Sequence, residues 1–303
     1  MLSSRLVKDE NRKCGVVALI GRPNAGKSTM LNRLVGEKIA IVSDKPQTTR
    51  TRITGVLTQP EGQIVFLDTP GIHKPIHKLN RRMMSFVTDA LSSVDLIVLL
   101  IDATQPMGRG DRFVLDMIRS TSTTAFLLPN KVDLMRDKKQ LLPLIKTYTD
   151  EREFAEVVPI SALTGDGVDL LIKKLFEALP TGPLLFPEDE MTDQPERVLA
   201  AEMVREKILQ ATGDELPYVT AVFTERWEET EGLTIIHCLI YVERASHRAI
   251  VIGKGGARLK EVGTAARADI EKLLGRRVFL NLFVKVRERW RDDERVLNEL
   301  GIS

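Results

Sequence analysis

The chain has 303 residues, 43% of them hydrophobic, and a formal net charge of +2. This length and composition predict about two ordinary domains. The two cysteines, Cys14 and Cys238, have no CxxC partner, which argues against a disulfide framework or a cysteine-based zinc site. No signal peptide is recognisable and the longest strongly apolar run, Leu96–Ile101, is too short to span a bilayer, so a cytoplasmic location is expected.

The positive charge is concentrated toward the C-terminal end. Between Ser246 and Arg291 there are twelve Lys and Arg residues and four acidic residues, so this stretch carries about +8 and the remainder about −6. A basic end of this kind is typical of nucleic-acid binding, but solvated helix faces are also rich in Lys and Arg. The charge alone therefore does not establish nucleic-acid binding, and a binding motif in the same stretch is needed.

The first predicted elements follow a charged leader at residues 1–13. The apolar run Val16–Ile20 reads as a strand and a helical pattern begins near Lys27, with a glycine-containing loop between them. The loop fits the Walker A pattern, in which backbone N–H groups hold phosphates at a helix N-terminus. In that pattern Lys27 contacts the β- and γ-phosphates and Ser28 contacts Mg²⁺. The residues predicted to bind the nucleotide here are Gly21, Arg22, Pro23, Asn24, Ala25, Gly26, Lys27, Ser28 and Thr29.

The next part of the chain alternates strands and helices after a polar loop, Glu37–Arg50. The predicted strands are Arg52–Leu57, Gln63–Asp68, Asp95–Asp102, Thr124–Leu128 and Glu156–Ile160. The predicted helices are Leu79–Leu91, Asp111–Arg119, Lys138–Tyr148 and Val168–Leu179. This alternation favours an α/β domain with a mostly parallel sheet covered on both faces.

Polar motifs follow three of these strands, at the sheet edge where ligands bind in such folds. Asp68 is a candidate Mg²⁺ ligand, and the Gly71 amide a candidate γ-phosphate contact. Asp133 can accept both the N1–H and the amine of guanine, which adenine does not offer. The motif residues predicted to bind the nucleotide are Asp68, Thr69, Pro70, Gly71, Asn130, Lys131, Val132, Asp133, Ser161 and Ala162. Asn130 suits the O6/N7 edge of guanine. The aliphatic part of Lys131 can cover the guanine ring, and a backbone N–H of Ser161–Ala162 can donate to O6.

In this order the motifs resemble the five signature motifs of the translation-factor-related P-loop GTPases. The resemblance implies hydrolysis of GTP to GDP and phosphate with Mg²⁺, held by Ser28, Thr49 and Asp68. It also implies that Thr49 closes over Mg²⁺ and the γ-phosphate, while Thr48 contributes backbone. The catalytic set it suggests is Lys27, Thr49, Gly71 and Asn24.

The residue after the Asp68–Gly71 motif is Ile72, where related GTPases have a glutamine that orients the attacking water. Isoleucine cannot hydrogen-bond to water, so slow turnover without RNA or K⁺ is expected. Asn24 resembles the asparagine that helps to hold a monovalent cation, commonly K⁺, in GTPases with this substitution.

The composition changes after residue 180. We predict a GTPase domain at 14–180, a proline-rich acidic linker at 181–195 and a second domain at 196–303. The predicted helices of the second domain are Glu196–Ala211, Ser246–Ile250, Ala257–Leu274 and Asp292–Leu300. Its predicted strands are Tyr218–Trp227, Leu233–Val242 and Val278–Val286. The order α-β-β-α-α-β is that of a small type II KH domain.

A glycine loop lies between two of these helices, inside the basic stretch. Gly253-Lys254-Gly255-Gly256 matches the GXXG loop of KH domains, where the backbone approaches the phosphates of a single strand. A GXXG sequence alone is often only a turn, but its place before an amphipathic helix favours the KH interpretation. The predicted RNA-binding residues are Ile250, Ile252, Gly253, Lys254, Gly255, Gly256, Arg258 and Lys260.

From about Cys14 to its end, the chain resembles the bacterial ribosome-assembly GTPases that carry a C-terminal KH domain. The resemblance implies binding of small-subunit ribosomal RNA near its 3′ end, a role in assembly of the small ribosomal subunit, peripheral association with the cell membrane, and a monomer. Two alternatives stay open: an RNA-binding module with a structural nucleotide site, and a GTPase whose basic domain docks on membrane or protein. A P-loop kinase is disfavoured by the motif at 130–133.

Overall fold

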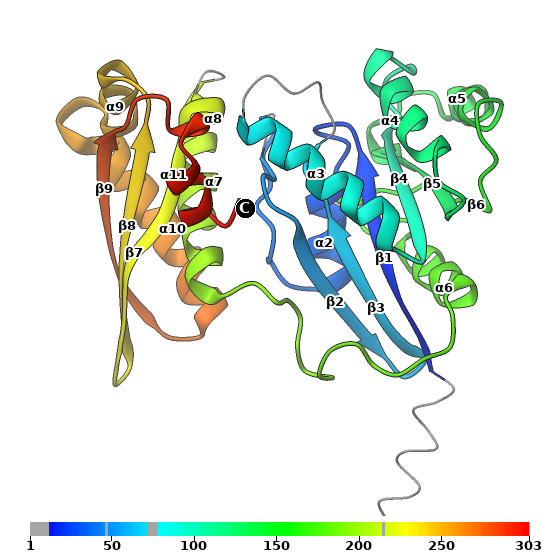
Figure 1. The fold of residues 1–303 in the computed structure, drawn as a ribbon, viewed down its shortest axis with the longest axis horizontal. Helices are drawn as coiled ribbons and strands as arrows, with labels where there is room; N and C mark the ends of the chain where they lie inside the picture. Colours follow the sequence, from blue (N-terminus) through cyan, green and yellow to red (C-terminus); the bar gives the residue numbers. More distant parts are fainter. Residues whose placement is uncertain (1–11, 46–47, 72–77, 214–215, 303) are drawn as a thin grey trace, which may run out of the picture. The chain divides into compact units, whose positions relative to one another are not determined.

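The computed structural model describes residues 12–45, 48–71, 78–213 and 216–302. These residues form two compact units (Figure 1). The first unit contains residues 12–39, 51–71 and 84–193. The second contains Gln194 to residue 302 together with two earlier segments, residues 40–50 and 78–83. The two earlier segments come from the part of the chain that the sequence predicts to be the GTPase domain.

The first unit is built on a six-stranded sheet with the order β2-β3-β1-β4-β5-β6. All neighbouring strands are parallel except β2 and β3. The strands are β1 (Lys13–Gly21), β2 (Ile53–Gln59), β3 (Gly62–Asp68), β4 (Leu96–Asp102), β5 (Thr124–Asn130) and β6 (Glu156–Val157). β1 lies between β3 and β4, so the strand order runs to one side of β1 for β2 and β3 and to the other side for β4 to β6. Ligands of α/β sheets bind at the carboxyl ends of the strands where the order reverses in this way.

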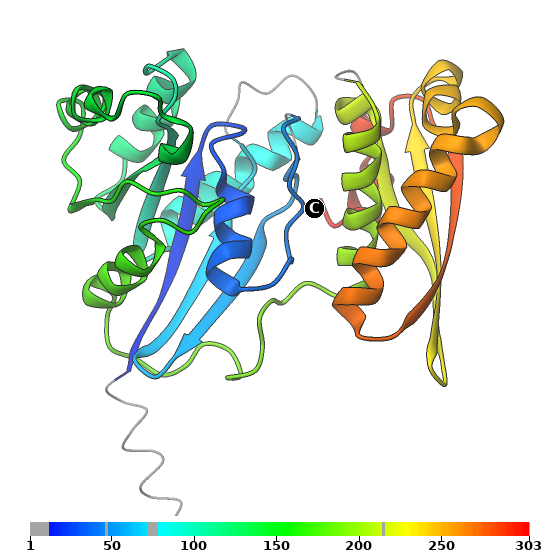
Figure 2. The ribbon, with the colours of Figure 1, turned by 180° about the vertical axis from the view of Figure 1, so that it is seen from behind.

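Helices cover both faces of this sheet, as Figures 1 and 2 show from opposite sides. They are α2 (Lys27–Val35), α3 (Lys78–Ser93), α4 (Arg109–Arg119), α5 (Leu141–Thr149) and α6 (Val168–Ala178), with 3₁₀ turns at η1 (Val132–Leu134) and η2 (Lys138–Gln140). Almost the whole of β4 is buried because its neighbours and helices enclose it. Val87, Val114 and Ile118 from α3 and α4 pack on the strands in one apolar core. The predicted doubly covered parallel sheet is confirmed.

The second unit has a three-stranded sheet with the order β7-β8-β9, with β7 and β8 antiparallel and β8 and β9 parallel. Its elements are α7 (Glu196–Ala211), α8 (Leu216–Val219), β7 (Ala221–Thr230), β8 (Leu233–Val242), α9 (Ala245–Ile252), η3 (Lys254–Gly256), α10 (Ala257–Leu274), β9 (Arg277–Val286), η4 (Trp290–Asp292) and α11 (Glu294–Glu299). Val204, Ile236, Ile240 and Ile270 are buried in its core. The predicted KH topology is confirmed, with α8 as an additional short helix.

Several element predictions were wrong at their ends, among them the helix predicted from Lys138, whose first three residues form the 3₁₀ turn η2. Tyr218 and Val219 were predicted as strand but lie in helix α8, and β7 begins at Ala221. Pro217 stands in the first turn of α8, where its missing N–H costs no helical hydrogen bond. The last strand of the first sheet ends at Val157 rather than at Ile160. The chain still bonds to β5 beyond that point, because Ile160 N donates to Pro129 O at 2.8 Å.

The predicted linker is attached to the first unit over part of its length. Val56 N on β2 donates to Met191 O at 2.8 Å, and the Thr192 hydroxyl donates to Thr54 O at 2.7 Å. The Gln63 side-chain oxygen accepts from the amides of Leu185 and Phe186, both at 2.8 Å. None of the helices in the described part of the chain combines the length and apolar character needed to cross a membrane.

Candidate functional site

The phosphate loop joins β1 to α2 through left-handed backbone positions. Asn24 has φ 64° and Gly26 has φ 98°. A Cβ atom at Gly26 would lie 2.2 Å from the Asn130 side-chain nitrogen. A side chain at position 26 would therefore meet both backbone strain and a clash, so glycine is required there. The loop leads directly to Lys27 at the N-terminus of α2, the arrangement that binds phosphate.

Lys27 is nearly buried, with 6% of its surface exposed. Its ammonium group donates to Gly21 O at 3.1 Å and to Arg22 O at 3.0 Å. Burial lowers the pKa of Lys27, and the charge of Asp68 acts in the opposite direction. The structure thus holds a poorly solvated ammonium at the loop, where phosphate oxygens can become its partners.

Two oxygen-bearing side chains that could bind a metal ion meet beside this loop. The Ser28 hydroxyl donates to Asp68 Oδ2 at 2.7 Å, and Asp68 is fully buried. A hydroxyl and a carboxylate from the P-loop and from the end of β3 are the donor set that P-loop proteins offer to Mg²⁺. No cluster of three or more His, Cys, Asp or Glu suited to a metal ion occurs within the described residues.

The Asp68–Gly71 motif is fixed against the P-loop. The Thr69 hydroxyl donates to Leu19 O at 2.9 Å, which ties the motif to β1. A Cβ at Gly71 would lie 2.8 Å from two carbon atoms of Pro23. Only glycine allows this close approach, so the Gly71 backbone lies next to the phosphate loop, as the predicted γ-phosphate contact requires.

Asn130 connects three of the predicted motifs. Its side-chain nitrogen donates to Ala25 O at 2.8 Å, and its oxygen accepts from Ala162 N at 2.9 Å. Asn130 itself is 2% exposed. The sequence predicted a contact between this amide and the O6/N7 edge of guanine, which stays a prediction. Its observed bonds are to backbone, and they hold the P-loop and the Ser161–Ala162 loop together.

Replacing Asn130 by alanine should lower the affinities for GTP and GDP together, by about 10-fold or more, because two buried backbone groups lose their partner. Titration of both nucleotides into the full chain measures this, with thermal unfolding to show that the variant is folded. If the GDP affinity were unchanged while the GTP affinity fell, Asn130 would not hold the two loops together for both nucleotides. GTP and GDP share the part of the site that these loops form.

Lys131 and Asp133, which were predicted to contact the guanine base, follow β5 and lie at η1. The Lys131 ammonium lies 2.6 Å from Asp102 Oδ2 at the end of β4. Burial opposes ionisation of Asp102, but its bonds with Lys131 and Thr104 hold the pKa of Asp102 below its usual range. Asp133 is exposed at η1. Asp102 was not predicted as a site residue; its position at a strand end in the sequence is the signal that could have found it.

The structure divides the predicted site residues between the two units. Every nucleotide-binding residue predicted from the sequence lies in the first unit. Thr48 and Thr49 belong to the second unit, and Thr49 is only 6% exposed. Ile72, whose position bears on the attacking water, lies outside the described residues.

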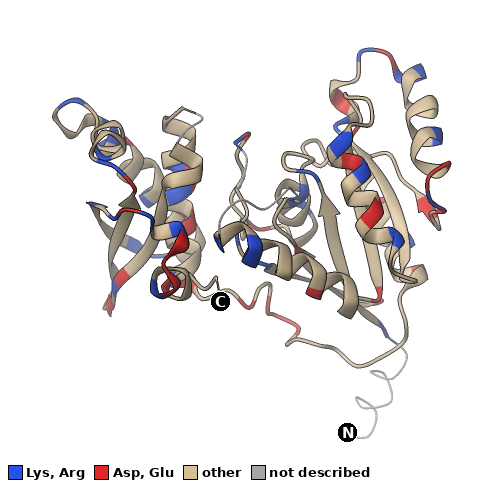
Figure 3. Ribbon diagram, turned by 45° about the horizontal axis from the view of Figure 1, so that its top comes forward, with Lys and Arg blue, Asp and Glu red and all other residues tan. Residues whose placement is uncertain are grey.

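The GXXG segment forms a tight turn between α9 and α10. Gly253, Gly255 and Gly256 have φ values of 73°, 58° and 81°. Three left-handed positions within four residues suit glycine and leave the backbone accessible. Figure 3 marks the Lys and Arg residues of the unit. The GXXG segment and α10 together carry five of them against three acidic residues, Glu261, Asp269 and Glu271.

A groove of about 410 Å³ lies beside this turn, between α10 and β9. It is lined by Gly256, Leu259, Lys260, Gly263, Thr264, Arg267, Phe279, Leu280 and Leu282. Gly256 and Lys260 were predicted from the sequence, whereas the β9 wall was not. The alternation along β9, which leaves Phe279 54% exposed, is the signal that could have found it. Ile250 and Ile252 are outside this lining, and the Arg258 guanidinium bonds to Ile250 O.

Family models match both units. Residues 16–131 match the model described as 50S ribosome-binding GTPase, and residues 215–291 match the KH domain model. The chain is 50% identical over 299 residues to GTPase Era of Geobacter metallireducens, covering 98% of this chain and all of that protein. It is 49% identical over 291 residues to GTPase Era of Alkaliphilus metalliredigens, covering 95% and 98% respectively.

Two solved structures are similar over nearly the full length. One is a single-residue variant of Aquifex aeolicus Era bound to GDP·AlF4⁻, with 40% identity and a TM-score of 0.93. The other is Era in complex with MgGDPNP and nucleotides 1506–1542 of 16S ribosomal RNA, with 41% identity and a TM-score of 0.93. Each comparison covers 96% of this chain and 99% of the other.

Proposed function

The chain belongs to the GTPase Era family and is therefore a GTP hydrolase, and from that premise we propose that its KH domain binds single-stranded RNA near the 3′ end of small-subunit ribosomal RNA. The proposal assigns it a role in assembly of the small ribosomal subunit, with GTP and GDP as alternative states. The observation that carries it is the GXXG turn with three left-handed glycines beside the α10–β9 groove. Such a turn lets phosphates approach the backbone while bases enter the groove.

In the proposed hydrolysis, residues of the P-loop bind and orient the triphosphate. Lys27 would exchange its carbonyl partners for β- and γ-phosphate oxygens, and the Gly71 amide would contact the γ-phosphate. Ser28, Asp68 and Thr49 would hold Mg²⁺, which when bound neutralises charge that develops on the phosphates. Asp133 would select guanine by accepting from N1–H and the exocyclic amine.

K⁺ is proposed as a further cation, with Asn24 as one of its ligands. Asn24 is exposed and left-handed at the tip of the P-loop, so its side chain is accessible beside the phosphate-binding backbone. A cation there would supply positive charge that an arginine finger supplies in other GTPases. Peripheral membrane association is a prediction that rests on the family resemblance alone. Cytoplasmic location and a monomeric state are further predictions from the sequence.

The proposed switch connects nucleotide to RNA. GTP would order residues 37–50 and 71–80 through Mg²⁺ and the γ-phosphate, and hydrolysis would release them. For this to control RNA binding, RNA must bind one nucleotide state better, and by linkage it must favour that nucleotide equally. Equal RNA affinity with a GTP analogue and with GDP would overturn the switch.

The function is tested by GTP turnover at fixed Mg²⁺, in K⁺ and in Na⁺, as the 3′-terminal segment of small-subunit ribosomal RNA is added. We expect the authentic RNA to raise turnover at least several-fold, and a scrambled RNA of equal length to leave it unchanged. K⁺ should give faster turnover than Na⁺. Tight, specific RNA binding without stimulation would instead favour an RNA-binding module whose nucleotide site is structural.

A further inference from the structure

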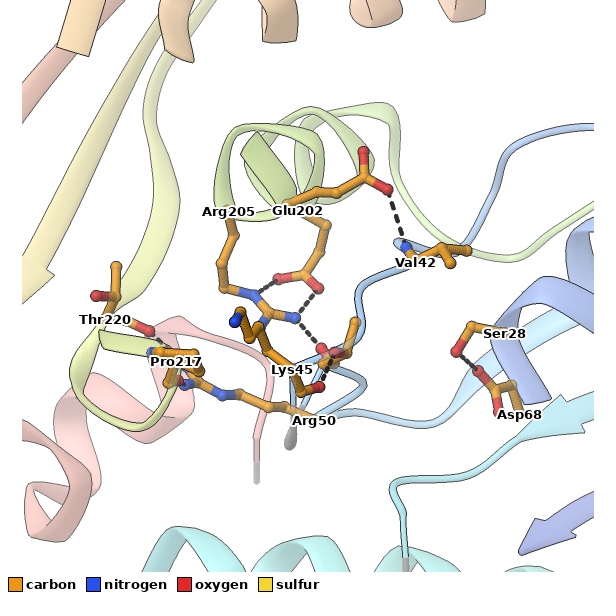
Figure 4. A network of polar contacts seen from close by, with 11 residues as sticks. Ser28, Val42, Lys45, Arg50, Asp68, Glu202, Arg205, Pro217 and Thr220 are labelled. Atoms are coloured by element: carbon orange, nitrogen blue, oxygen red, sulfur yellow. Dashed lines mark hydrogen bonds and ion pairs between the residues drawn. The ribbon is translucent and has the colours of Figure 1, made fainter. Parts of the chain in front are cut away.

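The loop predicted to close over Mg²⁺ is bound by the C-terminal unit. Residues 40–50, called here the switch segment, belong to the second compact unit although they precede β2 in the chain. Figure 4 shows Lys45 and Arg50 of this segment among side chains and carbonyls of that unit. The sequence gives no indication of this, because the contacts join residues more than 150 positions apart.

Arg50 is a buried charged residue of the segment, with 5% of its surface exposed. Its guanidinium donates to Thr220 O at 2.7 Å and to Pro217 O, the carbonyls around the end of α8. It also lies over the Trp290 ring, 5.4 Å from the ring centroid. Trp290 is fully buried and is itself fixed by a bond from its Nε1 to Val219 O at 2.8 Å. The two carbonyls and the ring face together suit a planar guanidinium group.

The binding of Arg50 is incomplete in a way that favours reversibility. Its Nε is buried, and no described residue accepts a hydrogen bond from it. Burial, together with the nearby charge of Arg205, lowers the pKa of Arg50 to about 9, so the group is still charged at pH 7. Burying a cation whose hydrogen bonds are incomplete costs free energy, which offsets part of the stabilisation from its two carbonyl bonds and the ring contact.

Two further contacts hold the backbone of the switch segment. Arg205, which is 1% exposed and paired with Glu202, donates to Thr48 O. Glu206 Oε1 accepts from Val42 N at 2.9 Å. The hydroxyl of Thr48 donates within the segment to Lys45 O at 2.6 Å. Thr49 is thus enclosed between a bound carbonyl on one side and the bound Arg50 on the other.

The start of α3 lies at the end of the second predicted switch region, residues 71–80, and bonds to the same unit. The Lys78 ammonium lies 3.1 Å from Glu294 Oε1, and Lys78 N donates to Asp292 Oδ1 at 3.1 Å. Arg82 donates to Asn298 at 3.0 Å and to Ile302 O. Residues of both predicted switch regions, 37–50 and 71–80, are therefore bound by the C-terminal unit.

We propose that Arg50 is a positioning residue through which the C-terminal unit withholds the adjacent Thr49 from the magnesium site. This rests on the proposed function, in which Thr49 must close over Mg²⁺ and the γ-phosphate. Thr49 is one peptide bond from Arg50. Closure of Thr49 on the nucleotide and burial of Arg50 in the Trp290 pocket therefore each fix the position of the same short backbone segment. GTP shifts this equilibrium because it alone provides the γ-phosphate contact, whereas GDP leaves Arg50 bound.

The direct test is to measure the fluorescence emission of Trp290 with each nucleotide bound. The chain has two tryptophans, so Trp227→Phe leaves Trp290 as the reporter. In that full-length parent we expect a GTP analogue with Mg²⁺ to shift Trp290 emission and GDP to leave it unchanged. Adding Arg50→Ala should abolish the difference between the nucleotides, and the matched control Arg52→Ala, an exposed arginine two positions away, should retain it. No shift in the parent would overturn the proposal.

A second measurement separates positioning from a structural role. Arg50→Ala should raise the GTP-analogue affinity relative to that of GDP by about 5- to 50-fold, and Arg50→Lys should lie between it and the parent. An unchanged ratio with intact RNA-stimulated turnover would overturn the inference and leave the proposed function standing. Loss of RNA stimulation in the parent itself would instead overturn the proposed function.

Discussion

Substituting Asp133 by asparagine is expected to lower the affinity for GTP by about 100-fold or more and to create measurable binding of XTP. The carboxylate is predicted to accept two hydrogen bonds from guanine, and an amide presents a donor where guanine also has a donor. Sites that depend on buried hydrogen bonds to a ligand discriminate by factors of this size. Xanthine has a carbonyl oxygen in place of the amine, so it can accept from the new amide.

The measurement is competitive titration of GTP, XTP and ATP against both forms of the full chain. Asp116→Asn is the matched control, because Asp116 is an exposed acid on α4 of the same unit, paired with Arg119. It should bind GTP like the original chain. If Asp133→Asn kept its preference for GTP over XTP, Asp133 would not read the base, and the guanine specificity would have to come from backbone groups.

The second large effect is expected in the KH domain. Replacing Gly255 by aspartate should weaken binding of the 3′-terminal ribosomal RNA segment by about 10- to 100-fold, because a carboxylate then faces the phosphates and the backbone can no longer approach them. Aspartate tolerates the left-handed region better than most residues, and no atom lies within 4 Å of the Cβ that it would add. The unit should therefore stay folded.

Gly275→Asp supplies the control for this effect. Gly275 is also left-handed, with φ 64°, and it too has open space around an added Cβ, but it ends α10 away from the GXXG turn. The Gly275→Asp substitution introduces the same charge as Gly255→Asp and a similar strain of a non-glycine residue at positive φ. Equal weakening of RNA binding by both variants would show that net charge, and not the turn, governs the interaction. GTP turnover without RNA should be unchanged in both.

The positions of the predicted nucleotide-binding motifs in the sheet were predictable because their signals are local. Strands of the first sheet end where apolar runs give way to polar motifs, so Gly21, Asp68 and Asn130 could be assigned to one edge from spacing alone. The GXXG turn was predictable for the same reason: three glycines with positive φ interrupt two helical patterns. The end of β6 and the start of β7 were less well predicted, because Pro159 and Pro217 alter backbone bonding without changing the apolar pattern.

Sequence by itself determined the two-part architecture, the motifs of the GTP site and the GXXG turn, since each is written in a few neighbouring residues. Only the tertiary structure decided the partners of those motifs. It assigned Asn130 to backbone groups of two loops, supplied the β9 wall of the groove beside the GXXG turn, and enclosed Arg50 between the carbonyls near α8 and the Trp290 ring. The physical reason is that a backbone carbonyl or a ring face can bind any suitable group that folding brings to it, and no periodicity in the chain records which group that is.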